Sequence, residues 1–367
     1  MPDLRNIPLF KVFMAPEAHL IPALRKVLYG GQISEGAEVE AFEAAFGRYI
    51  GNPRVLSFYC GTAALHAGLV LAGVGPGTEV ISTPLTAEPT NLAILHAGAG
   101  VVWADIDPRN GNIDPGSIAD RITDHTRAIV VVHYGGIPAS LTAIRELATA
   151  RSIPVIEDAA HALGARYDGI LLGSHSQYVM FSFQAIKHLT TADGGMLACR
   201  NAGDLARGRR IRWFGIDRKA PRTEADITEV GYKYHMNNLN AVIGCVQLNH
   251  IKPVISRHID NGKYLDLALK GIPGIELPSW DAAAEPSYWF YTVFAERRDD
   301  LSRYLAERGI ASSLVHRRND LHGIFDSSRR ELPGLDRIYS RMLHIPCGWW
   351  VSDEDREYLV DTIRRGW

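Results

Sequence analysis

Short apolar runs alternate with helix-like segments over roughly the first 245 residues of the chain. Short runs bounded by turn residues are typical of strands, and apolar positions repeating every three to four residues are typical of helices. The predicted strands are residues 54–58, 79–82, 101–104, 128–132, 153–156, 178–181 and 196–199, and the predicted helices between them are residues 62–72, 88–97 and 141–150. This alternation predicts an α/β domain with a mostly parallel sheet that is covered by helices on both faces.

The pattern changes after about residue 250. Residues 287–295 are aromatic and β-branched and are predicted to form a strand, as are residues 311–315. Residues 298–308 and the charged segment 353–365 are predicted helices. We therefore expect a large α/β domain over residues 1–250, which includes the N-terminal segment, and a smaller α+β domain over residues 251–367.

Composition and charge narrow the class of protein. The net charge of −2 argues against a dedicated nucleic-acid-binding protein, which would carry a basic excess. The N-terminal segment has charges where a signal peptide needs an apolar core, and the longest uncharged stretch, residues 55–78, is interrupted by glycines and a proline. We therefore expect a cytoplasmic protein without a membrane span. The cysteines lack metal-binding spacing and no histidine cluster suggests a metal site; the cysteines are Cys60, Cys199, Cys245 and Cys347.

The first motif with candidate chemistry is Cys60-Gly61-Thr62, which follows a predicted strand and opens a predicted helix. A glycine lets a ligand approach the backbone, and the helix start offers free N–H groups and the positive end of the helix dipole. The motif is therefore a candidate phosphate site. An ordinary helix start, with Thr62 as its N-cap and Gly61 in the preceding loop, is the alternative.

The second motif is Glu157-Asp158, which ends an apolar strand and is followed by His161. A carboxylate at a buried strand end needs a partner because an unpaired buried charge is costly. The cationic ring nitrogen of a ligand would be such a partner. A helix N-cap aspartate followed by a core histidine is the alternative.

The third motif is Lys187, in a polar turn that precedes Gly194-Gly195. A lone lysine is usually a solvated surface residue. Here, however, both Asp158 and Lys187 come just after a predicted strand, and the candidate phosphate site lies upstream. Pyridoxal phosphate (PLP) needs such a set: a lysine to bond its aldehyde, an acid against its ring nitrogen and N–H groups for its phosphate. Desolvation should lower the pKa of this lysine so that its amine can move a proton.

Several motifs together closely resemble the DegT/DnrJ/EryC1/StrS family, the sugar aminotransferases among fold-type-I PLP enzymes. They are EDAAHALGA at 157–165, FSFQAIKHLTTADGGM at 181–196, CGTAAL at 60–65, HYGG at 133–136 and GYKYHM at 231–236. The resemblance covers essentially the whole chain. It implies the fold-type-I architecture, a cofactor that alternates between PLP and its pyridoxamine form, and a homodimer with shared active sites.

The resemblance also implies roles for single residues. Lys187 is the catalytic lysine that forms the Schiff base, Asp158 faces the pyridine nitrogen, and His161 contacts the 3-hydroxyl side of the ring. The implied phosphate contacts are Gly61, Thr62 and Ser182, with Gln184 close by and Lys233 reaching in from the neighbouring subunit. Many family members stack an aromatic side chain on the ring from the segment that corresponds to residues 83–90. That segment has no aromatic residue here, so Ala87, Glu88 or another segment is expected to cover the ring.

The implied reaction is transfer of an amino group from glutamate to a nucleotide-linked keto sugar, most simply a 4-keto-6-deoxy sugar, to make an amino sugar for an O-antigen or an antibiotic. His316 and Arg317 correspond to a region that approaches the substrate, where an arginine would suit a diphosphate; an exposed salt-bridged loop is the alternative. A 3-keto sugar or keto-cyclitol acceptor and a non-catalytic sugar-binding or regulatory relative also remain open. The basic run 207–212 is predicted to be a solvated helix face, with an anionic nucleotide site as the alternative.

Overall fold

The computed structural model describes residues 5–218 and 220–367. At its centre is a seven-stranded sheet with the order β1-β9-β8-β5-β4-β2-β3, in which β9 runs antiparallel to both neighbours and the other neighbouring pairs are parallel. The strands are β1 (Val55–Phe58), β2 (Glu79–Ser82), β3 (Gly100–Trp103), β4 (Thr126–Val132), β5 (Val155–Asp158), β8 (Tyr178–Ser182) and β9 (Gly195–Cys199). The predicted mostly parallel sheet is therefore confirmed.

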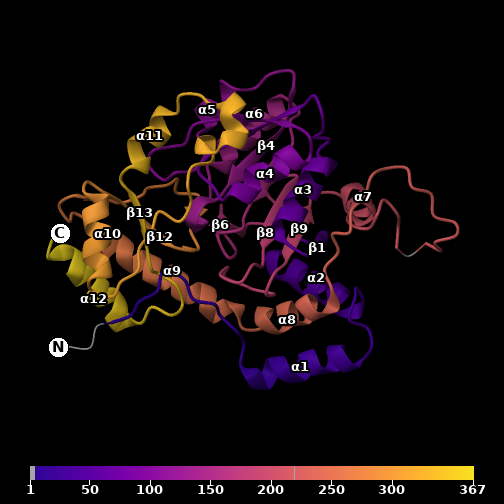
Figure 1. Cartoon of the computed structure of the whole chain (residues 1–367), viewed down its shortest axis with the longest axis horizontal. Helices are drawn as coiled ribbons and strands as arrows, with labels where there is room; N and C mark the ends of the chain where they lie inside the picture. The colour runs from indigo at the N-terminus through magenta and orange to yellow at the C-terminus, as the bar shows by residue number, and fades with distance from the viewer. Residues whose placement is uncertain (1–4, 219) are drawn as a thin grey trace.

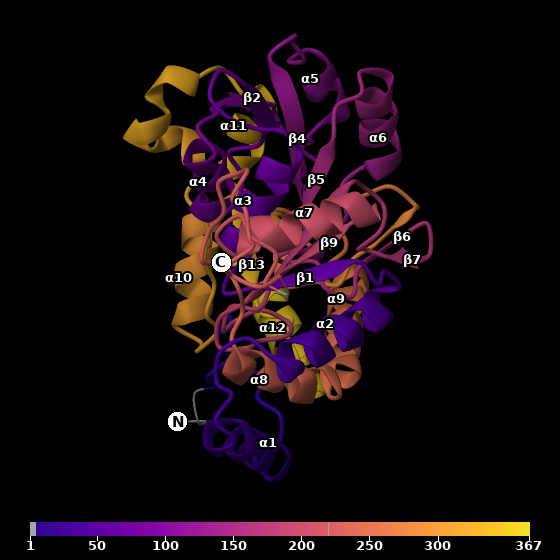
Figure 2. The same ribbon diagram turned by 90° about the vertical axis from the view of Figure 1, so that its right-hand side faces the viewer.

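Helices cover both faces of this sheet, because its central strands are apolar on both sides. In β4, Ile129 and Val131 pack into one hydrophobic core, while Ala128 and Val130 pack into another. Figure 2 shows α3 and α4 on one side of the sheet and α6 on the other. The helices of this part are α2 (Ala37–Ile50), α3 (Gly61–Leu71), α4 (Glu88–His96), α5 (Pro115–Ala119), α6 (Leu141–Ala150), α7 (Ala202–Arg212) and α8 (Asn238–Leu248).

The C-terminal part builds a second sheet with the order β10-β12-β13. Its elements are α9 (Ile251–Ala268), β10 (Ile275–Glu276), β12 (Tyr291–Ala295), α10 (Arg298–Ala306), α11 (Pro333–Tyr339), β13 (Met342–Ile345) and α12 (Asp353–Arg364). A third, small sheet joins β11 (Ala284–Glu285) to β6 (Arg166–Tyr167) and β7 (Ile170–Leu171). The strand predicted at residues 311–315 is wrong: Ser313 makes an isolated bridge to His344, and the rest of this segment is a loop.

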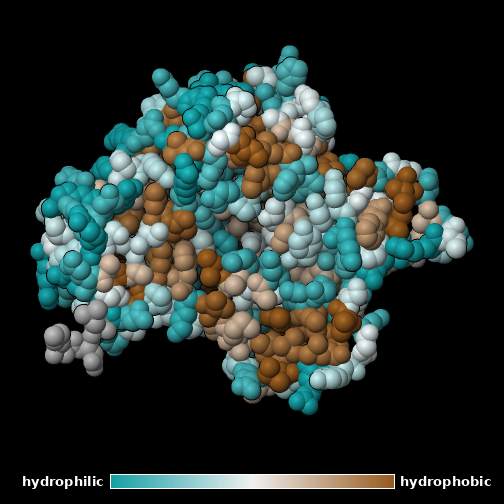
Figure 3. All heavy atoms as spheres, viewed as in Figure 1, coloured by the Kyte–Doolittle hydropathy of each residue, from teal (hydrophilic) through white to brown (hydrophobic). Residues whose placement is uncertain are grey.

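Two features at the edge of the molecule were not predicted from the sequence. The helix α1 (Glu17–Tyr29) packs against α8, and the described residues between α7 and α8, 213–218 and 220–237, form a segment that projects away from the body of the molecule (Figure 1). A hydrophobic patch covers α1 in the space-filling view (Figure 3), where Ile21, Leu28 and Tyr29 are exposed. Among the residues that the structure describes, no helix has both the length and the apolar character needed to cross a membrane.

Candidate active site

The register of the central sheet brings three motifs to one edge. Gly195, the first residue of β9, pairs with Phe58 at the end of β1 and with Ser182 at the end of β8. The next strand, β5, pairs Asp158 with Met180 of β8. Residues that follow β1, β5 and β8 therefore lie close together, as expected for the carboxyl ends of strands in an open α/β sheet.

Close backbone packing forms the candidate phosphate site. The helix α3 begins at Gly61, and its N-cap is Cys60, whose Sγ accepts a hydrogen bond from the Ala63 N–H (3.4 Å). The alternative with Thr62 as the N-cap is therefore wrong, and Thr62 lies in the first turn of the helix. A Cβ atom on Gly195 would lie 2.5 Å from the carbonyl oxygen of Cys60. Only glycine at this position lets the start of α3 approach β9 so closely.

Asp158 is buried at the end of β5, with hydrogen bonds to both carboxylate oxygens. Its Oδ1 accepts from the Ala160 N–H (3.0 Å), and its Oδ2 accepts from the Thr90 hydroxyl (2.8 Å). Burial raises the pKa of Asp158, while these two hydrogen bonds and the charge of Lys187 act in the opposite direction. No helix begins after β5, so the N-cap alternative for Asp158 is wrong.

Lys187 lies in the turn after β8, with its Nζ 3.7 Å from the centre of the Trp289 ring. Burial lowers the pKa of this amine to about 7, against the opposing effect of the Asp158 carboxylate. A large fraction of the amine is therefore neutral at neutral pH, as expected for a lysine that acts as a nucleophile or a proton carrier. The aromatic run around Trp289 predicted only a strand, so the sequence did not identify this contact.

A stack of rings forms one wall of the site. The imidazole of His161 stacks on Trp289, with ring centres 3.9 Å apart, and lies parallel to the imidazole of His316 at 5.5 Å. The Nδ1 atom of His161 is buried and has no hydrogen-bond partner. Burial holds the pKa of His161 well below its usual range and lowers that of His316 to about 4, so both rings are neutral at neutral pH.

A cavity of about 800 Å³ unites these groups. The predicted site residues that line it are Gly61, Thr62, Asp158, His161, Ser182, Gln184, Lys187 and His316. Two predicted residues lie elsewhere: Arg317 is exposed and bonds the Leu321 carbonyl oxygen (3.1 Å), and Lys233 is exposed on the projecting segment. The segment without an aromatic residue also reaches the cavity, where Ala87 and Glu88 are among its lining residues.

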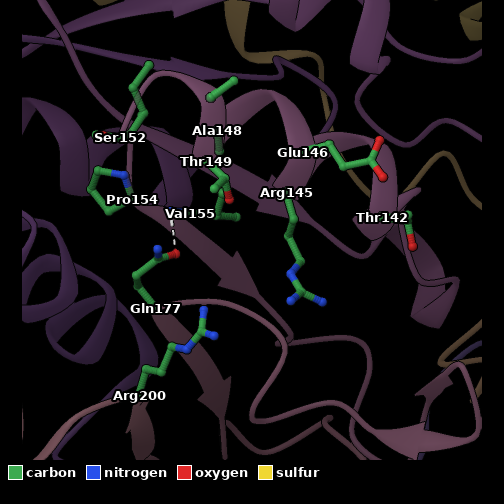
Figure 4. Close-up of a pocket in the computed structure, with 12 residues that line it drawn as sticks. Thr142, Arg145, Glu146, Ala148, Thr149, Ser152, Pro154, Val155, Gln177 and Arg200 are labelled. Atoms are coloured by element: carbon green, nitrogen blue, oxygen red, sulfur yellow. Dashed lines mark hydrogen bonds between the residues drawn. The ribbon is translucent and has the colours of Figure 1, made fainter.

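A second cavity, of about 960 Å³, lies beside the C-terminal end of α6 (Figure 4). Its lining includes Val155, the first residue of β5, whose N–H bonds Gln177 Oε1 (3.1 Å). It is therefore at the opposite end of this strand from Asp158. None of the predicted site residues lines this second cavity. The cavity of about 800 Å³ is therefore the better candidate for the active site, although the second cavity is larger.

The prediction of a solvated face for the basic run in α7 holds for part of the run: the side chains of Arg207 and Arg210 are 39% and 38% exposed, and Arg209 is exposed, whereas Arg212 is buried. Arg207 and Arg210 both pair with Glu229, and Arg212 is buried between Glu35 and Glu43. These ion pairs tie the projecting segment and α2 to α7. Arg207, Arg210 and Arg212 are thus paired with carboxylates of the fold, which argues against an anionic nucleotide site at these three side chains.

The side chains that line the smaller cavity fit PLP. An amine that is neutral at moderate pH, a buried carboxylate and a helix start with a free hydroxyl match the aldehyde, the ring nitrogen and the phosphate of that cofactor. The buried Nδ1 of His161, which has no protein partner, leaves a polar atom for a ring substituent. This set joins residues from three strand ends of the sheet.

Comparison with known proteins agrees with this chemistry. The sugar aminotransferase CalS13 from Micromonospora echinospora is 41% identical, with a TM-score of 0.95 over 98% of this chain and 100% of that one. The spore coat polysaccharide biosynthesis protein SpsC of Bacillus subtilis (strain 168) is 29% identical over 362 residues, which are 94% of this chain and 93% of SpsC. Spr1654 from Streptococcus pneumoniae, solved in PLP and PMP forms, is 25% identical; the PLP form has a TM-score of 0.90 over 98% of each chain.

The family comparison covers nearly the whole length. The sequence profile of the DegT/DnrJ/EryC1/StrS aminotransferase family matches residues 16–364. This range contains all three sheets and every residue that lines the candidate site except Leu9 and Phe10. The chain therefore belongs to the DegT/DnrJ/EryC1/StrS aminotransferase family and is an aminotransferase.

Proposed function

We propose that this enzyme uses PLP to move an amino group from glutamate to a nucleotide-linked keto sugar, most simply a 4-keto-6-deoxy sugar. The observation that carries the proposal is the position of Lys187, whose buried amine shares one cavity with Asp158 and the start of α3. The relatives described above include a sugar aminotransferase and a polysaccharide biosynthesis protein. Glutamate would leave as 2-oxoglutarate, and the sugar ketone would become an amine.

Each part of the cofactor has a counterpart among the side chains. Bound PLP supplies an aldehyde that exchanges amino groups and a ring that accepts electrons. The N–H groups at the start of α3, with the hydroxyls of Thr62 and Ser182, would hold the phosphate, and Gln184 is close by, since its backbone N–H donates to the Ser182 hydroxyl oxygen (3.4 Å). Asp158 would keep a proton on the ring nitrogen, and His161 would contact the 3-hydroxyl side of the ring through its Nδ1, which has no protein partner.

Lys187 would move the proton during the reaction. Its amine must take a proton from a carbon atom and then deliver it to another, so both protonation states must be accessible. A pKa of about 7, caused by burial, meets this requirement near neutral pH. The rings of His161 and His316 beside Lys187 are neutral at neutral pH. They therefore place no second positive charge near the carboxylate of Asp158.

The sugar would enter from the side of the C-terminal part. His316 belongs to the loop that replaces the predicted strand, and its imidazole lines the cavity. The cavity volume of about 800 Å³ is near the upper end of the usual range for ligand sites, about 300–1,000 Å³, and so leaves space beyond the cofactor. Arg317, exposed one residue further along, would meet a diphosphate at the mouth of the cavity.

A homodimer would complete the site. The exposed apolar side chains of α1 form a patch that monomeric proteins rarely leave open to water (Figure 3). The projecting segment also carries the exposed Ile227 and Val230, and Lys233 is exposed at its base, where it makes an isolated β-bridge with Trp213. In a dimer these apolar groups would be buried, and Lys233 would reach the phosphate of the partner subunit. All four cysteines are free thiols, which supports a cytoplasmic location.

The test is a panel of acceptors with glutamate as the donor, read by mass spectrometry for the amino product. The panel contains nucleotide-linked 4-keto and 3-keto sugars, the same sugars without the nucleotide, and a keto-cyclitol. Amination of a nucleotide-linked 4-keto sugar, lost when the nucleotide is removed, is the expected result. Amination of the free cyclitol alone would contradict the nucleotide-linked substrate, and no amination at all would contradict the sugar acceptor.

A further inference from the structure

Buried hydroxyl groups support the carboxylate of Asp158 from the loop after β2, which holds Thr86, and from the first turn of α4, which holds Thr90. Thr86 and Thr90 are both nearly inaccessible to solvent, at 1% and 3% exposure. The Thr90 hydroxyl donates to Asp158 Oδ2 (2.8 Å), and the Thr86 and Thr90 hydroxyl oxygens are 3.0 Å apart. Since the single proton of Thr90 is used on Asp158, Thr86 must be the donor in the second hydrogen bond. The two hydroxyls therefore form a chain that points toward the carboxylate.

The same segment also holds the loop that carries His316. Asn319 is completely buried, and its Nδ2 donates to the Thr86 carbonyl oxygen (3.0 Å). Its Oδ1 accepts from Asn91 Nδ2 (2.8 Å), and its backbone N–H donates to the Pro84 carbonyl oxygen (2.8 Å). The hydrogen bonds of Asn319 thus join the loop to both ends of the segment that contains the two threonines.

The carboxylate of Asp158 needs hydrogen-bond donors such as these hydroxyls because it is buried. A buried carboxylate favours its protonated form unless donors stabilise the charge, and no helix N-terminus follows Asp158 to provide them. The donors that the structure provides are the Ala160 N–H and the Thr90 hydroxyl. A hydroxyl that itself accepts a hydrogen bond is a stronger donor, because such chains polarise one another.

We propose that Thr90, supported by Thr86, is a positioning residue that keeps Asp158 ionised and oriented, and that Asn319 ties this hydroxyl chain to the substrate-facing loop. The proposal rests on the proposed role of Asp158 at the cofactor ring. One segment, residues 84–91, then sets the geometry of both the ring acid and the loop that carries His316.

The decisive comparison is Thr90→Val against Thr90→Ser. Valine keeps the shape and removes the donor, whereas serine keeps the hydroxyl. The matched control is Thr83→Val, in the same part of the chain, because Thr83 Oγ1 accepts from the Leu85 N–H (3.2 Å), whereas the hydrogen bonds of the chain join the hydroxyls of Thr86 and Thr90 to Asp158. Two readouts are used: binding of PLP to the cofactor-free protein, and the pH at which the visible absorbance of the bound cofactor changes.

The expected result is a weakening of PLP binding by Thr90→Val of about tenfold to a hundredfold, the size of one hydrogen bond to a charged group. The midpoint of the absorbance titration should rise by about one pH unit. Without an ionised Asp158, the pyridine ring of the cofactor would lose its positive charge, and the nearby nitrogen of Lys187 would then hold its proton more tightly. Thr90→Ser and Thr83→Val should both remain close to the unsubstituted protein. Equal behaviour of Thr90→Val and Thr83→Val would overturn the proposal.

Two further variants separate this proposal from the proposed function. If Asp158→Asn leaves the absorbance midpoint unchanged, the role of Asp158 at the ring is wrong and the proposal falls with it. If Asp158→Asn moves the midpoint but Thr90→Val does not, only the hydroxyl chain is wrong. Asn319→Ala should raise the KM for the sugar and also move the midpoint upward; movement of the KM alone would contradict the link between loop and acid.

Discussion

Glu157 and Asp158 are neighbours in β5, yet their carboxylates lie in opposite surroundings. Glu157 is completely buried and bonds His133 Nε2 (3.0 Å), while His133 Nδ1 accepts from the Ala139 N–H (3.1 Å). Both ring nitrogens of His133 are therefore used within the core. Asp158, one residue later, lines the cavity and faces Lys187. The carboxylate of Glu157 is thus surrounded by protein groups, whereas that of Asp158 borders the cavity in which a ligand can bind.

The difference teaches that burial of an acid does not by itself identify a functional residue. Burial would raise the pKa of Glu157, but the hydrogen bond from His133 lowers it below its ordinary value. For Asp158 the effect of burial remains larger than that of its hydrogen bonds, so its pKa stays raised without a further partner. A cationic ring nitrogen in the cavity would be that partner. We therefore expect Glu157 to contribute to the stability of the fold and Asp158 to contribute to catalysis.

The largest effect is expected on the cavity side, for Lys187→Ala. Loss of the amine removes both the covalent hold on the cofactor and the proton carrier, so activity should fall by at least about 10³-fold. The measurement is the rate of amino-sugar formation, together with the visible absorbance that remains after gel filtration. Lys263→Ala, which removes an exposed lysine on α9, is the control and should change neither. Substantial activity in Lys187→Ala would remove the basis for the cavity as the catalytic site.

A paired substitution tests the two acids directly. Asp158→Asn keeps the shape of the side chain and removes its charge, and should lower kcat by about 10²–10³-fold with little loss of thermal stability. Glu157→Gln should destabilise the fold by about 1–3 kcal/mol, because it replaces the charged acceptor of the His133 N–H by a neutral amide in a buried place. The value of kcat should stay nearly unchanged. Thermal unfolding and steady-state kinetics of both variants provide the comparison. The opposite division of effects would show that Glu157 is the acid that matters for catalysis.

The pH dependence of cofactor capture adds a finer test. Burial lowers the pKa of Lys187 to about 7 in the cofactor-free protein, and only the neutral amine attacks an aldehyde. The capture rate should therefore rise about tenfold per pH unit below the pKa and level off above it. Stopped-flow absorbance after mixing with PLP measures this rate. A plateau that begins only near pH 10 would mean that Lys187 is solvated and that the cavity does not enclose it.

The smallest effects are expected at the mouth of the cavity. His316→Ala should raise the KM for the sugar substrate by about threefold to tenfold, the size of one neutral hydrogen bond, because its imidazole lines the cavity. Arg317→Ala should have a smaller effect, since that side chain is exposed and lies outside the lining. Steady-state kinetics at saturating glutamate measure both. A larger effect of Arg317 would show that its guanidinium turns inward when substrate binds.

Much of the fold and part of the site follow from local patterns. The hydrophobic pattern predicted every strand of the central sheet. A strand that is covered on both faces is a short, uninterrupted apolar run, which distinguishes it from a surface loop. The same patterns placed Gly61, Asp158 and Lys187 after strand ends, and strand ends of an open α/β sheet meet at one edge. The helix α1 was not predicted, because apolar residues lie both on its buried side (Leu20 and Val27) and on its exposed side (Ile21 and Leu28), so that no single apolar face marks it in the sequence.

Only the tertiary structure decided which groups complete the site. Trp289 and His316 come from the C-terminal part of the chain, and their contacts with Lys187 and His161 depend on how that part packs against the central sheet. The alternation of a strand requires Glu157 and Asp158 to face opposite ways, but it does not say which one meets the cavity. That choice depends on side chains more than twenty residues away in sequence, among them His133 and Thr90. Local sequence therefore determined the chemistry available at the edge of the sheet, and long-range packing determined which of it is open to a ligand.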